Sequence, residues 1–353
     1  MEGGIGLTIY IALLVLPFIV HVLYAKNRKL EVIIDSLILI AFVGLRAPSV
    51  GADTVRYINH FNEIAAWDLS SMIPNAIEHE SPFYVIYAWL ISRFTVSIPI
   101  YFCTVAVLHY WALGRLMLKY STNIPFSYFI YCCLFLTLQL SGIKNTLVTT
   151  FVFLALDMAI EKKLGKFLAL LVVAFLFHRT SAIVVLAYPL INMKHKPNWT
   201  RLIAGGFFVL LWLGTFVLRV PIANVFKVIG GYEDYGIQNA QPWTMTILCL
   251  AIVALGIFIN DGERVFQSEL LICCAAALFM PLVFVNPSSL RVVRYFLCVA
   301  IFMIPQSIRK LDRQLRVQSI NAVTALFFAA SLAWQFLDTF SGGSVYDYSF
   351  FWQ

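Results

Sequence analysis

Long apolar runs separated by short polar breaks limit what this chain can fold into more than any other feature. A helix needs about 20 mostly apolar residues to cross about 30 Å of hydrocarbon, and many runs approach this length. Hydrophobic residues make up 61% of the 353 residues and charged residues only 12%, whereas soluble domains have about 25% charged residues. The pattern excludes a soluble protein and predicts one all-α, polytopic membrane domain over residues 1–353.

The apolar runs predict about 12 transmembrane helices, because several runs are too short for a full crossing. No internal repeat or low-complexity tract accompanies them. The runs lie near 5–24, 31–46, 82–95, 97–118, 125–141, 143–160, 166–178, 181–193, 202–219, 243–259, 268–286, 290–307 and 318–337.

Basic residues set the orientation, because Lys and Arg collect in short cytoplasmic loops. The net charge of +7 is therefore attributed to topology, and nucleic acid is not expected as a partner. The basic breaks at 26–29, 162–163, 194–196 and 309–316 share one side, the cytoplasm, only if run 82–95 does not cross fully or a neighbouring run is re-entrant. Two longer loops, 47–81 and 220–242, then lie on the outer side.

Nine basic residues remain on or near that outer side, several at the edge of an apolar run. A cation there runs against the positive-inside tendency and favours an anionic partner, although each one alone could snorkel to lipid head groups. As a set they indicate an outward-facing site for an anion. They are Arg46, Arg56, Arg93, Lys144, Arg179, Arg219, Lys227, Arg291 and Arg294.

Both outer loops carry aromatic residues among polar ones, for example Tyr57 and Phe61 in the first and Tyr232 and Tyr235 in the second. Aromatic rings suit stacking on sugars. An interfacial aromatic belt has the same composition without any ligand, so the sequence leaves both interpretations open.

The densest polar cluster is residues 44–57, where a span ends and the first outer loop begins. Asp53 or Thr54 is expected to cap a new helix, which would place Asp53 and Tyr57 on one face at i and i+4. The cluster is either a well-capped helix start or a ligand contact, and Arg46 lies within it.

Two further sites lie at the predicted outer ends of helices. Lys144 opens run 143–160, where the positive end of the helix dipole disfavours a cation and an anion would stabilise both. His178 and Arg179 stand beside two hydroxyl residues between runs, and the near-neutral titration of histidine suits proton transfer. Glu80 precedes run 82–95 and could offer a carboxylate base or part of a metal site.

Arg291 and Arg294 give the strongest anion signal in the chain. They are three residues apart on one predicted helix face, with Tyr295 beside them. Two such guanidinium groups repel each other, and a bidentate phosphate relieves that repulsion. No Asp-x-Asp motif lies in an outer loop, and no Gly-x-x-x-x-Gly-Lys loop or Gly-x-Ser-x-Gly elbow occurs, which disfavours a nucleotide-driven pump, a lipase-type hydrolase and a nucleotide-sugar transferase.

These motifs resemble the EpsG-like branch of the Wzy polysaccharide polymerases. The resemblance rests on G-L-R-x-x-x-V-G-A-D-T-x-x-Y at 44–57, E-S-P-F at 80–83, A-F-L-F-H-R-T-S-A at 174–182 and R-x-x-R-Y-F at 291–296, in the order of the family. One departure is Lys144-Asn145, where the family usually has Arg-Gln. Lysine keeps the charge but loses bidentate geometry.

The resemblance implies a GT-C-like glycosyltransferase of the bacterial inner membrane that transfers a glycan from undecaprenyl pyrophosphate onto a new lipid-linked repeat unit at the periplasmic face. It implies no cofactor and no metal, with the lipid-linked glycans, the bilayer and a chain-length regulator as partners. His178 or Asp53 would deprotonate the acceptor. Arg46, Lys144, Arg291 and Arg294 would hold the departing pyrophosphate, and Tyr57 and Glu80 would position sugars. Arg179 and Tyr295 would also contact substrate.

Other functions remain open at this stage. A flippase or exporter of the same lipid-linked glycan would use the same cations, but it needs an anion path from the cytoplasm. An O-antigen ligase shares the donor and differs in its acceptor. A membrane acyltransferase could use His178 as base, and a scaffold without chemistry would leave the outer cations unexplained.

Overall fold

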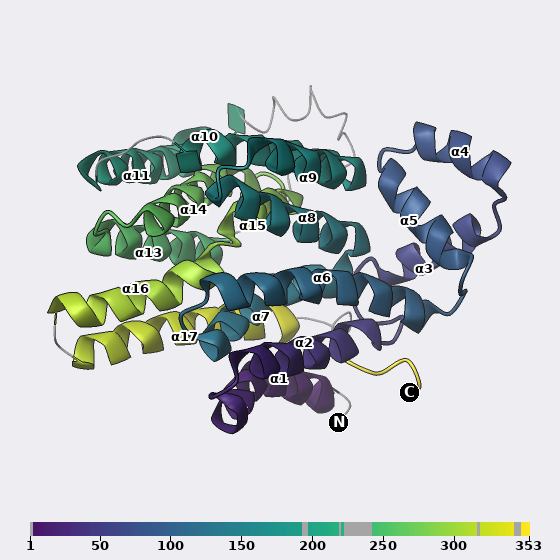
Figure 1. The fold of residues 1–353 in the computed structure, drawn as a ribbon, viewed down its shortest axis with the longest axis horizontal. Coiled ribbons are helices and arrows are strands. Elements are labelled where there is room, and N and C mark those ends of the chain that lie inside the picture. Colours follow the sequence, from purple (N-terminus) through teal and green to yellow (C-terminus); the bar gives the residue numbers. More distant parts are fainter. Residues whose placement is uncertain (1–2, 193–196, 219, 222–241, 316–317, 342–346) are drawn as a thin grey trace. The chain divides into compact units, whose positions relative to one another are not determined.

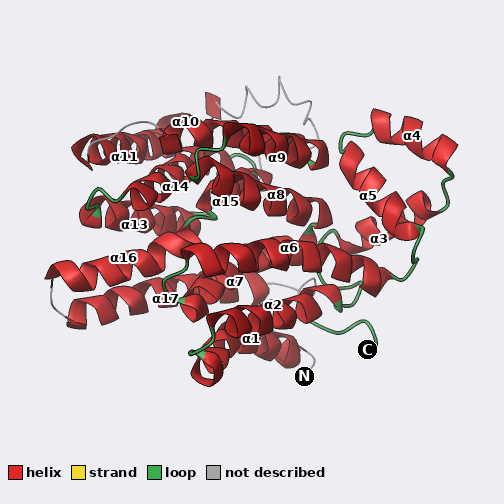
Figure 2. Ribbon diagram, viewed as in Figure 1, coloured by secondary structure: helices red, strands yellow, loops and turns green. Residues whose placement is uncertain are grey.

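The computed structural model describes residues 3–192, 197–218, 220–221, 242–315, 318–341 and 347–353. These residues are helical apart from short connections and one isolated antiparallel bridge between Arg46 and Phe350 (Figure 2). The all-α prediction is therefore confirmed. Nearly all of the predicted outer loop 220–242, including Tyr232 and Tyr235, lies outside the described residues.

The chain divides into two compact units. The first comprises Met1–Met158, Leu164–Ala182 and Phe336–Gln353, and the second comprises Ala159–Lys163 and Ile183–Gln335. The helices that begin in the first unit are α1 (Gly3–Tyr24), α2 (Arg28–Gly44), α3 (Thr54–Ala65), α4 (Leu69–Glu78), α5 (Pro82–Ser92), α6 (Ile98–Tyr120), α7 (Ile124–Ser141), α8 (Ile143–Ile160), α9 (Leu164–Phe177) and the 3₁₀ helix η1 (Arg179–Leu186).

In the first unit, α2 packs along α6, and α1 packs on α2 and α7. Gly44 permits the closest approach of α2 to α6, because a Cβ atom there would lie 2.5 Å from Cys103 Sγ and 3.0 Å from its Cα. Helices α3 and α4 pack on α5, which packs on α9. Figure 1 shows α3, α4 and α5 grouped at one end of this unit.

Burial within the first unit follows the apolar pattern of each helix. Every residue of α7 from Ile124 to Leu140 is buried, which suits a helix that is apolar on all sides. By contrast α1 exposes Val15 by 48%, Ile19 by 49% and Val22 by 81%. In a membrane protein such an exposed apolar face suits contact with lipid.

The predicted outer loop 47–81 is mostly helical, because α3 and α4 lie within it. Helix α3 begins at Thr54 with Asp53 at the N-cap position, as the sequence predicted, but the Asp53 side chain makes no capping hydrogen bond. Of the two interpretations left open for the aromatic residues of this loop, stacking on a sugar does not apply to Phe61, because its ring is not accessible. Phe61 is fully buried and stacks on Tyr101 with ring centroids 4.1 Å apart.

The second unit is organised around one helix, α14 (Arg264–Val283), which contacts five neighbouring helices. The neighbours are α10 (Ala187–Asn192), α11 (Pro197–Leu213), α13 (Trp243–Ile259), α15 (Leu290–Leu297) and α16 (Ala300–Leu315), with the π-helical turn η2 (Gly214–Leu218), the 3₁₀ turn η3 (Pro287–Ser289) and α17 (Gln318–Ser341) completing the described elements. The apolar run 290–307, expected to be one span, is divided into α15 and α16, which are bent by 53°.

Among the described residues, five helices are long and apolar enough to cross a membrane, or six if the bent pair is one span. Five further apolar helices have 10–17 residues. Helix α5 has 11 residues and is therefore about 16 Å long, which is too short for a full crossing. This length agrees with one of the two alternatives that the orientation by charge left open. The chain is a membrane protein by these criteria, and the number of about 12 spans stays a prediction.

Candidate functional site

The segment 44–57 is anchored to the end of α7. Gly51 has a φ of +97°, and a Cβ atom there would lie 2.1 Å from the Leu140 carbonyl oxygen, so only glycine fits this turn. The Thr54 hydroxyl donates to the carbonyls of Val50 at 2.5 Å and Leu140 at 3.2 Å. These contacts explain why Gly51 and Thr54 occur in the segment 44–57. We call the end of the first unit that holds this segment and the junction of α7 and α8 the motif end.

Arg46 is buried at the motif end, with an exposed fraction of 2%. Its Nη1 donates to the Val43 carbonyl, while Nε and Nη2 have no acceptor in the described structure. The guanidinium lies 4.2 Å from the ring centroid of Phe102. A buried cation with unpaired donors costs free energy, and an anion with several oxygen acceptors would satisfy those donors.

Lys144 and Glu80 meet at the start of α8. Their Nζ and Oε1 atoms are 3.4 Å apart, with the lysine side chain 15% exposed and the glutamate 67% exposed. Lys144 Nζ also lies 5.3 Å from the ring centroid of Tyr84, and Tyr84 packs edge-on against Tyr57 at 5.7 Å. The structure therefore brings Tyr57, Glu80 and Lys144 together around Tyr84.

The charge of Lys144 dominates this group. Partial burial raises the pKa of Glu80, but the charge of Lys144, its hydrogen bond and the nearby His178 outweigh that effect, so the pKa is lowered. Glu80 thus stays a carboxylate at neutral pH and can accept hydrogen bonds.

His178 is held in one orientation by Thr180. Its Nδ1 accepts the Thr180 backbone N–H at 3.3 Å and lies 2.9 Å from the Thr180 hydroxyl. A nitrogen that accepts from a backbone N–H carries no proton, so the neutral ring carries its proton on Nε2. The preceding residue, Phe177, fixes the position by packing on Phe83 and Phe151.

Arg179 follows at the start of η1 and is exposed, whereas Ser181 is fully buried. The Ser181 hydroxyl has no hydrogen-bond partner in the described structure. Two buried side-chain amides beside the α7–α8 junction also have unpaired atoms, namely both polar atoms of Gln139 and Oδ1 of Asn145. Unpaired buried polar groups are rare in folded proteins, and those at the motif end are consistent with a polar ligand there.

Sequence reasoning missed His60. Its ring lies 5.4 Å from that of His79 and 5.5 Å from that of Tyr84, so it joins the Lys144 and Glu80 group. Burial, His79 and Lys144 lower the pKa of His60, and burial and Lys144 lower that of His79. The spacing of three residues from Tyr57 along α3 was the signal that could have identified it.

Arg291, Arg294 and Tyr295 belong to the second unit and lie together on α15. The two arginines are half-buried, and Tyr295 is fully buried. The prediction that both arginines lie on one helix is confirmed, and their role as an anion site stays a prediction.

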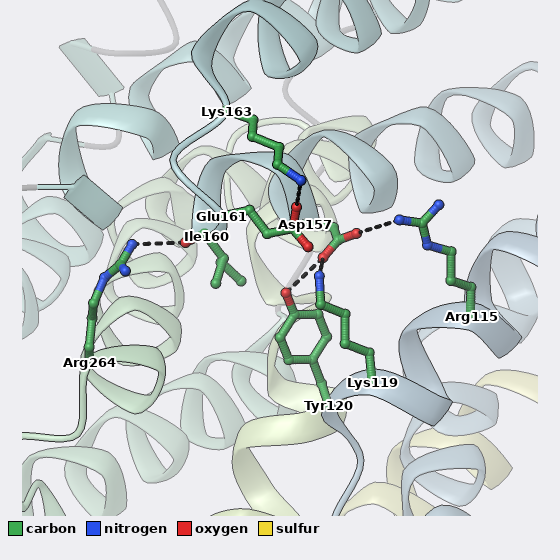
Figure 3. A network of polar contacts seen from close by, with 8 residues as sticks. All are labelled: Arg115, Lys119, Tyr120, Asp157, Ile160, Glu161, Lys163 and Arg264. Atoms are coloured by element: carbon green, nitrogen blue, oxygen red, sulfur yellow. Dashed lines mark hydrogen bonds and ion pairs between the residues drawn. The ribbon is translucent and has the colours of Figure 1, made fainter.

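At the far end of α8, a second polar group of the first unit surrounds Asp157, about 20 Å along the helix axis from Lys144. Figure 3 shows Lys119, Arg115 and Tyr120 converging on this carboxylate, whose side chain is fully buried. Tyr120 donates to it at 2.7 Å and Arg115 at 3.4 Å, and Lys119 forms an ion pair with it.

Two other polar contacts in Figure 3 belong to the second unit. Lys163 pairs with Glu161 at 2.5 Å, and Arg264 donates to the Ile160 carbonyl at 2.9 Å. In the described part of the chain, no three His, Cys, Asp or Glu side chains lie close enough to hold a metal ion.

Comparison with known proteins identifies one family. No curated protein and no solved structure matches the chain. The EpsG family, whose members are Wzy-type polysaccharide polymerase-like proteins, matches residues 29–350. That range includes all the candidate residues described above. The chain therefore belongs to the EpsG family and is a polysaccharide polymerase-like membrane protein.

Proposed function

We propose that this chain is a glycosyltransferase that polymerises undecaprenyl-pyrophosphate-linked repeat units into O-antigen or exopolysaccharide at the periplasmic face of a bacterial inner membrane. The observation that carries the proposal is the family match over residues 29–350. The unpaired donors of Arg46 and the unpaired amides beside Lys144 support it, because a pyrophosphate-linked glycan offers oxygens for both.

The proposed reaction transfers a whole glycan in one displacement. A hydroxyl of the acceptor sugar attacks the anomeric carbon of the donor glycan, and the bond from that carbon to the pyrophosphate oxygen breaks. Undecaprenyl pyrophosphate leaves with the bonding electrons, and the hydroxyl proton passes to a base. Cations beside the leaving group stabilise the negative charge that develops on it.

Five cations are proposed to hold the pyrophosphate groups of donor and acceptor. Arg46 has unpaired donors for this purpose, and Lys144 has a side chain that remains 15% exposed. Because Glu80 is far more exposed than Lys144, a phosphate could replace it as the partner of the lysine. The five are Arg46, Lys144, Arg179, Arg291 and Arg294.

Of the two candidate bases, the geometry favours Asp53. The neutral ring of His178 carries its proton on Nε2, so Nε2 donates a hydrogen bond to an anion rather than accepting a proton. The Asp53 carboxylate is half-buried at the N-cap position and makes no capping bond. Tyr57 and Glu80 are proposed to position sugars, with the exposed Glu80 carboxylate accepting from sugar hydroxyls.

The function is tested by the glycan profile of cells that lack this gene. Loss of the long-chain ladder with a single repeat unit still attached, rescued by the wild type and not by Arg291→Ala, establishes a polymerase whose site includes Arg291. Loss of all glycan would instead indicate a flippase or a ligase. An unchanged ladder would refute the proposal.

An assay of chain extension with purified protein and a lipid-linked substrate distinguishes the two candidate bases, Asp53 and His178. We expect Asp53→Asn to abolish chain extension, whereas His178→Gln keeps a side-chain donor and retains part of the activity that His178→Ala loses. Normal activity of Asp53→Asn, with none in His178→Gln, would assign the base to His178.

A further inference from the structure

The segment 347–351, which we call the strap, pairs with the motif end of the first unit. The Ala47 backbone N–H donates to the Ser349 carbonyl at 2.9 Å, and the Phe351 N–H donates to the Leu45 carbonyl at 3.0 Å. These two bonds form the isolated bridge between Arg46 and Phe350. The strap therefore lies directly on the backbone that carries Arg46.

One tyrosine anchors the strap. Tyr348 is 5% exposed, its ring stacks on Phe42 with centroids 4.0 Å apart, and its hydroxyl donates to the Phe42 carbonyl at 2.7 Å. The ring also packs edge-on against Tyr10 at 6.0 Å. Beyond this anchor the contacts become exposed, since Phe351 is 46% and Trp352 59% exposed.

Arg46 is enclosed by the same group of residues. The electrostatic neighbours of its guanidinium include Tyr348, Tyr110 and Tyr10, and Phe102 lies beneath it. The strap contributes Tyr348 to this group and pairs with the backbone of Arg46 itself, whose side chain is 2% exposed. A phosphate group cannot reach the unpaired Nε and Nη2 atoms unless part of the enclosure moves.

The strap is the part of the enclosure with the fewest attachments. In the described part of the chain, two backbone hydrogen bonds, one hydroxyl bond and the ring contacts of Tyr348 with Phe42 and Tyr10 hold it. The other walls belong to α1, α2 and α6, which pack against each other or against α7 along their lengths. Elements held by few contacts open at the lowest free-energy cost.

We propose that the strap is a reversible cover of Arg46: it closes the site by pairing with residues 45–47 and opens to admit the pyrophosphate of a lipid-linked substrate. This inference rests on the proposed function for the identity of the ligand. The cover would keep the guanidinium out of contact with other anions between transfers, and its release would make Arg46 available as substrate arrives.

A disulfide lock tests the proposal. Ala47→Cys and Ser349→Cys are introduced together, with Cys103→Ala in both the variant and its control because Cys103 is the partly exposed member of the free cysteines in the described structure. We expect the reduced variant to extend glycans like its control, the oxidised variant to lose at least tenfold, and reduction to restore the rate. Full activity of the oxidised variant would show that the strap is a fixed wall and overturn the proposal.

A second readout does not depend on polymerase activity. Farnesyl pyrophosphate, a short analogue of the lipid carrier, is expected to slow formation of the 47–349 disulfide severalfold, whereas farnesol does not. Arg46→Gln in the same background should abolish this protection. If farnesyl pyrophosphate protects but the wild type extends no chains, the proposed function is refuted and the proposal for the strap stands. If there is no protection and chain extension is normal, only the proposal for the strap is refuted.

Discussion

The two ends of the first unit differ in how they compensate a buried charge. Around Asp157, a fully buried carboxylate is surrounded by Lys119, Arg115 and Tyr120, so its oxygens are paired (Figure 3). At the motif end, the buried guanidinium of Arg46 makes one hydrogen bond and keeps Nε and Nη2 unpaired. The first arrangement is complete within the protein, and the second needs a further partner.

This difference separates charges with a structural role from those proposed to bind a ligand more clearly than the sequence does. In both places a charged residue lies at or near the end of an apolar run, and both look alike in one dimension. A complete set of partners stabilises the fold, whereas an incomplete set lowers stability and persists where it serves a function. Substitutions at the motif end should therefore lower activity and spare stability, whereas substitutions around Asp157 should lower stability and spare activity.

Arg46→Gln should have the largest effect on activity. We expect chain extension to fall at least about 100-fold, as when one donor to a developing anion is removed, while the unfolding temperature stays unchanged or rises because an unpaired buried charge is gone. The activity of Arg46→Lys should lie between those of the wild type and Arg46→Gln, since lysine keeps the charge but lacks the fork of donors. If the unfolding temperature of Arg46→Gln in detergent fell as far as that of an Asp157 variant, the contrast between the two ends would be wrong.

Asp157→Asn should have the reverse signature. Removing one partner of a buried ion pair costs about 3–5 kcal/mol, and we expect about 2 kcal/mol here because Lys119 and Arg115 are 33% and 49% exposed and can be hydrated. Activity per folded molecule should not change. The matched control is Arg115→Gln, whose long and half-exposed contact predicts a loss of less than about 1 kcal/mol.

Lys144→Ala should reduce activity about tenfold, the effect of losing about 1.4 kcal/mol of interaction with the transition state. Its effect on stability should stay below about 1 kcal/mol, because its partner Glu80 is 67% exposed. Lys144→Arg keeps the positive charge and adds a fork of donors, so it should retain or exceed wild-type activity. Equal losses in the Ala and Arg variants would show that the size of the side chain matters and its charge does not.

The smallest effect concerns pH. The pKa values of His60 and His79 are lowered in the folded protein, so below about 6.5 the unfolded chain binds more protons than the folded one. Stability should therefore decrease as the pH falls through about 6.5 toward the lowered values. Unfolding temperatures recorded across this range should vary less with pH in a His60→Gln, His79→Gln double variant than in the wild type.

The sequence was a good guide wherever one residue or one run determines the outcome. The apolar runs predicted an all-helical membrane protein. The cluster at 44–57 predicted a new helix capped by Asp53 or Thr54, and α3 begins at Thr54. Lys144 and Glu80 were selected separately, but only the fold shows that they meet, because they are 64 residues apart in the chain. The burial of Phe61 depends on its contact with Tyr101, which no local pattern reveals. The pairing of residues 349 and 351 with 47 and 45 is equally non-local.

The glycine at position 44 has a mechanical consequence. Because α2 touches α6 at Gly44 without space for a single methyl group, the helix cannot slide or rotate there without steric clash. The backbone around Arg46 is thus held in a fixed position relative to α6. Gly44→Ala would push the two helices apart and shift the Arg46 guanidinium, so this one variant would misalign the proposed anion site without removing any charge.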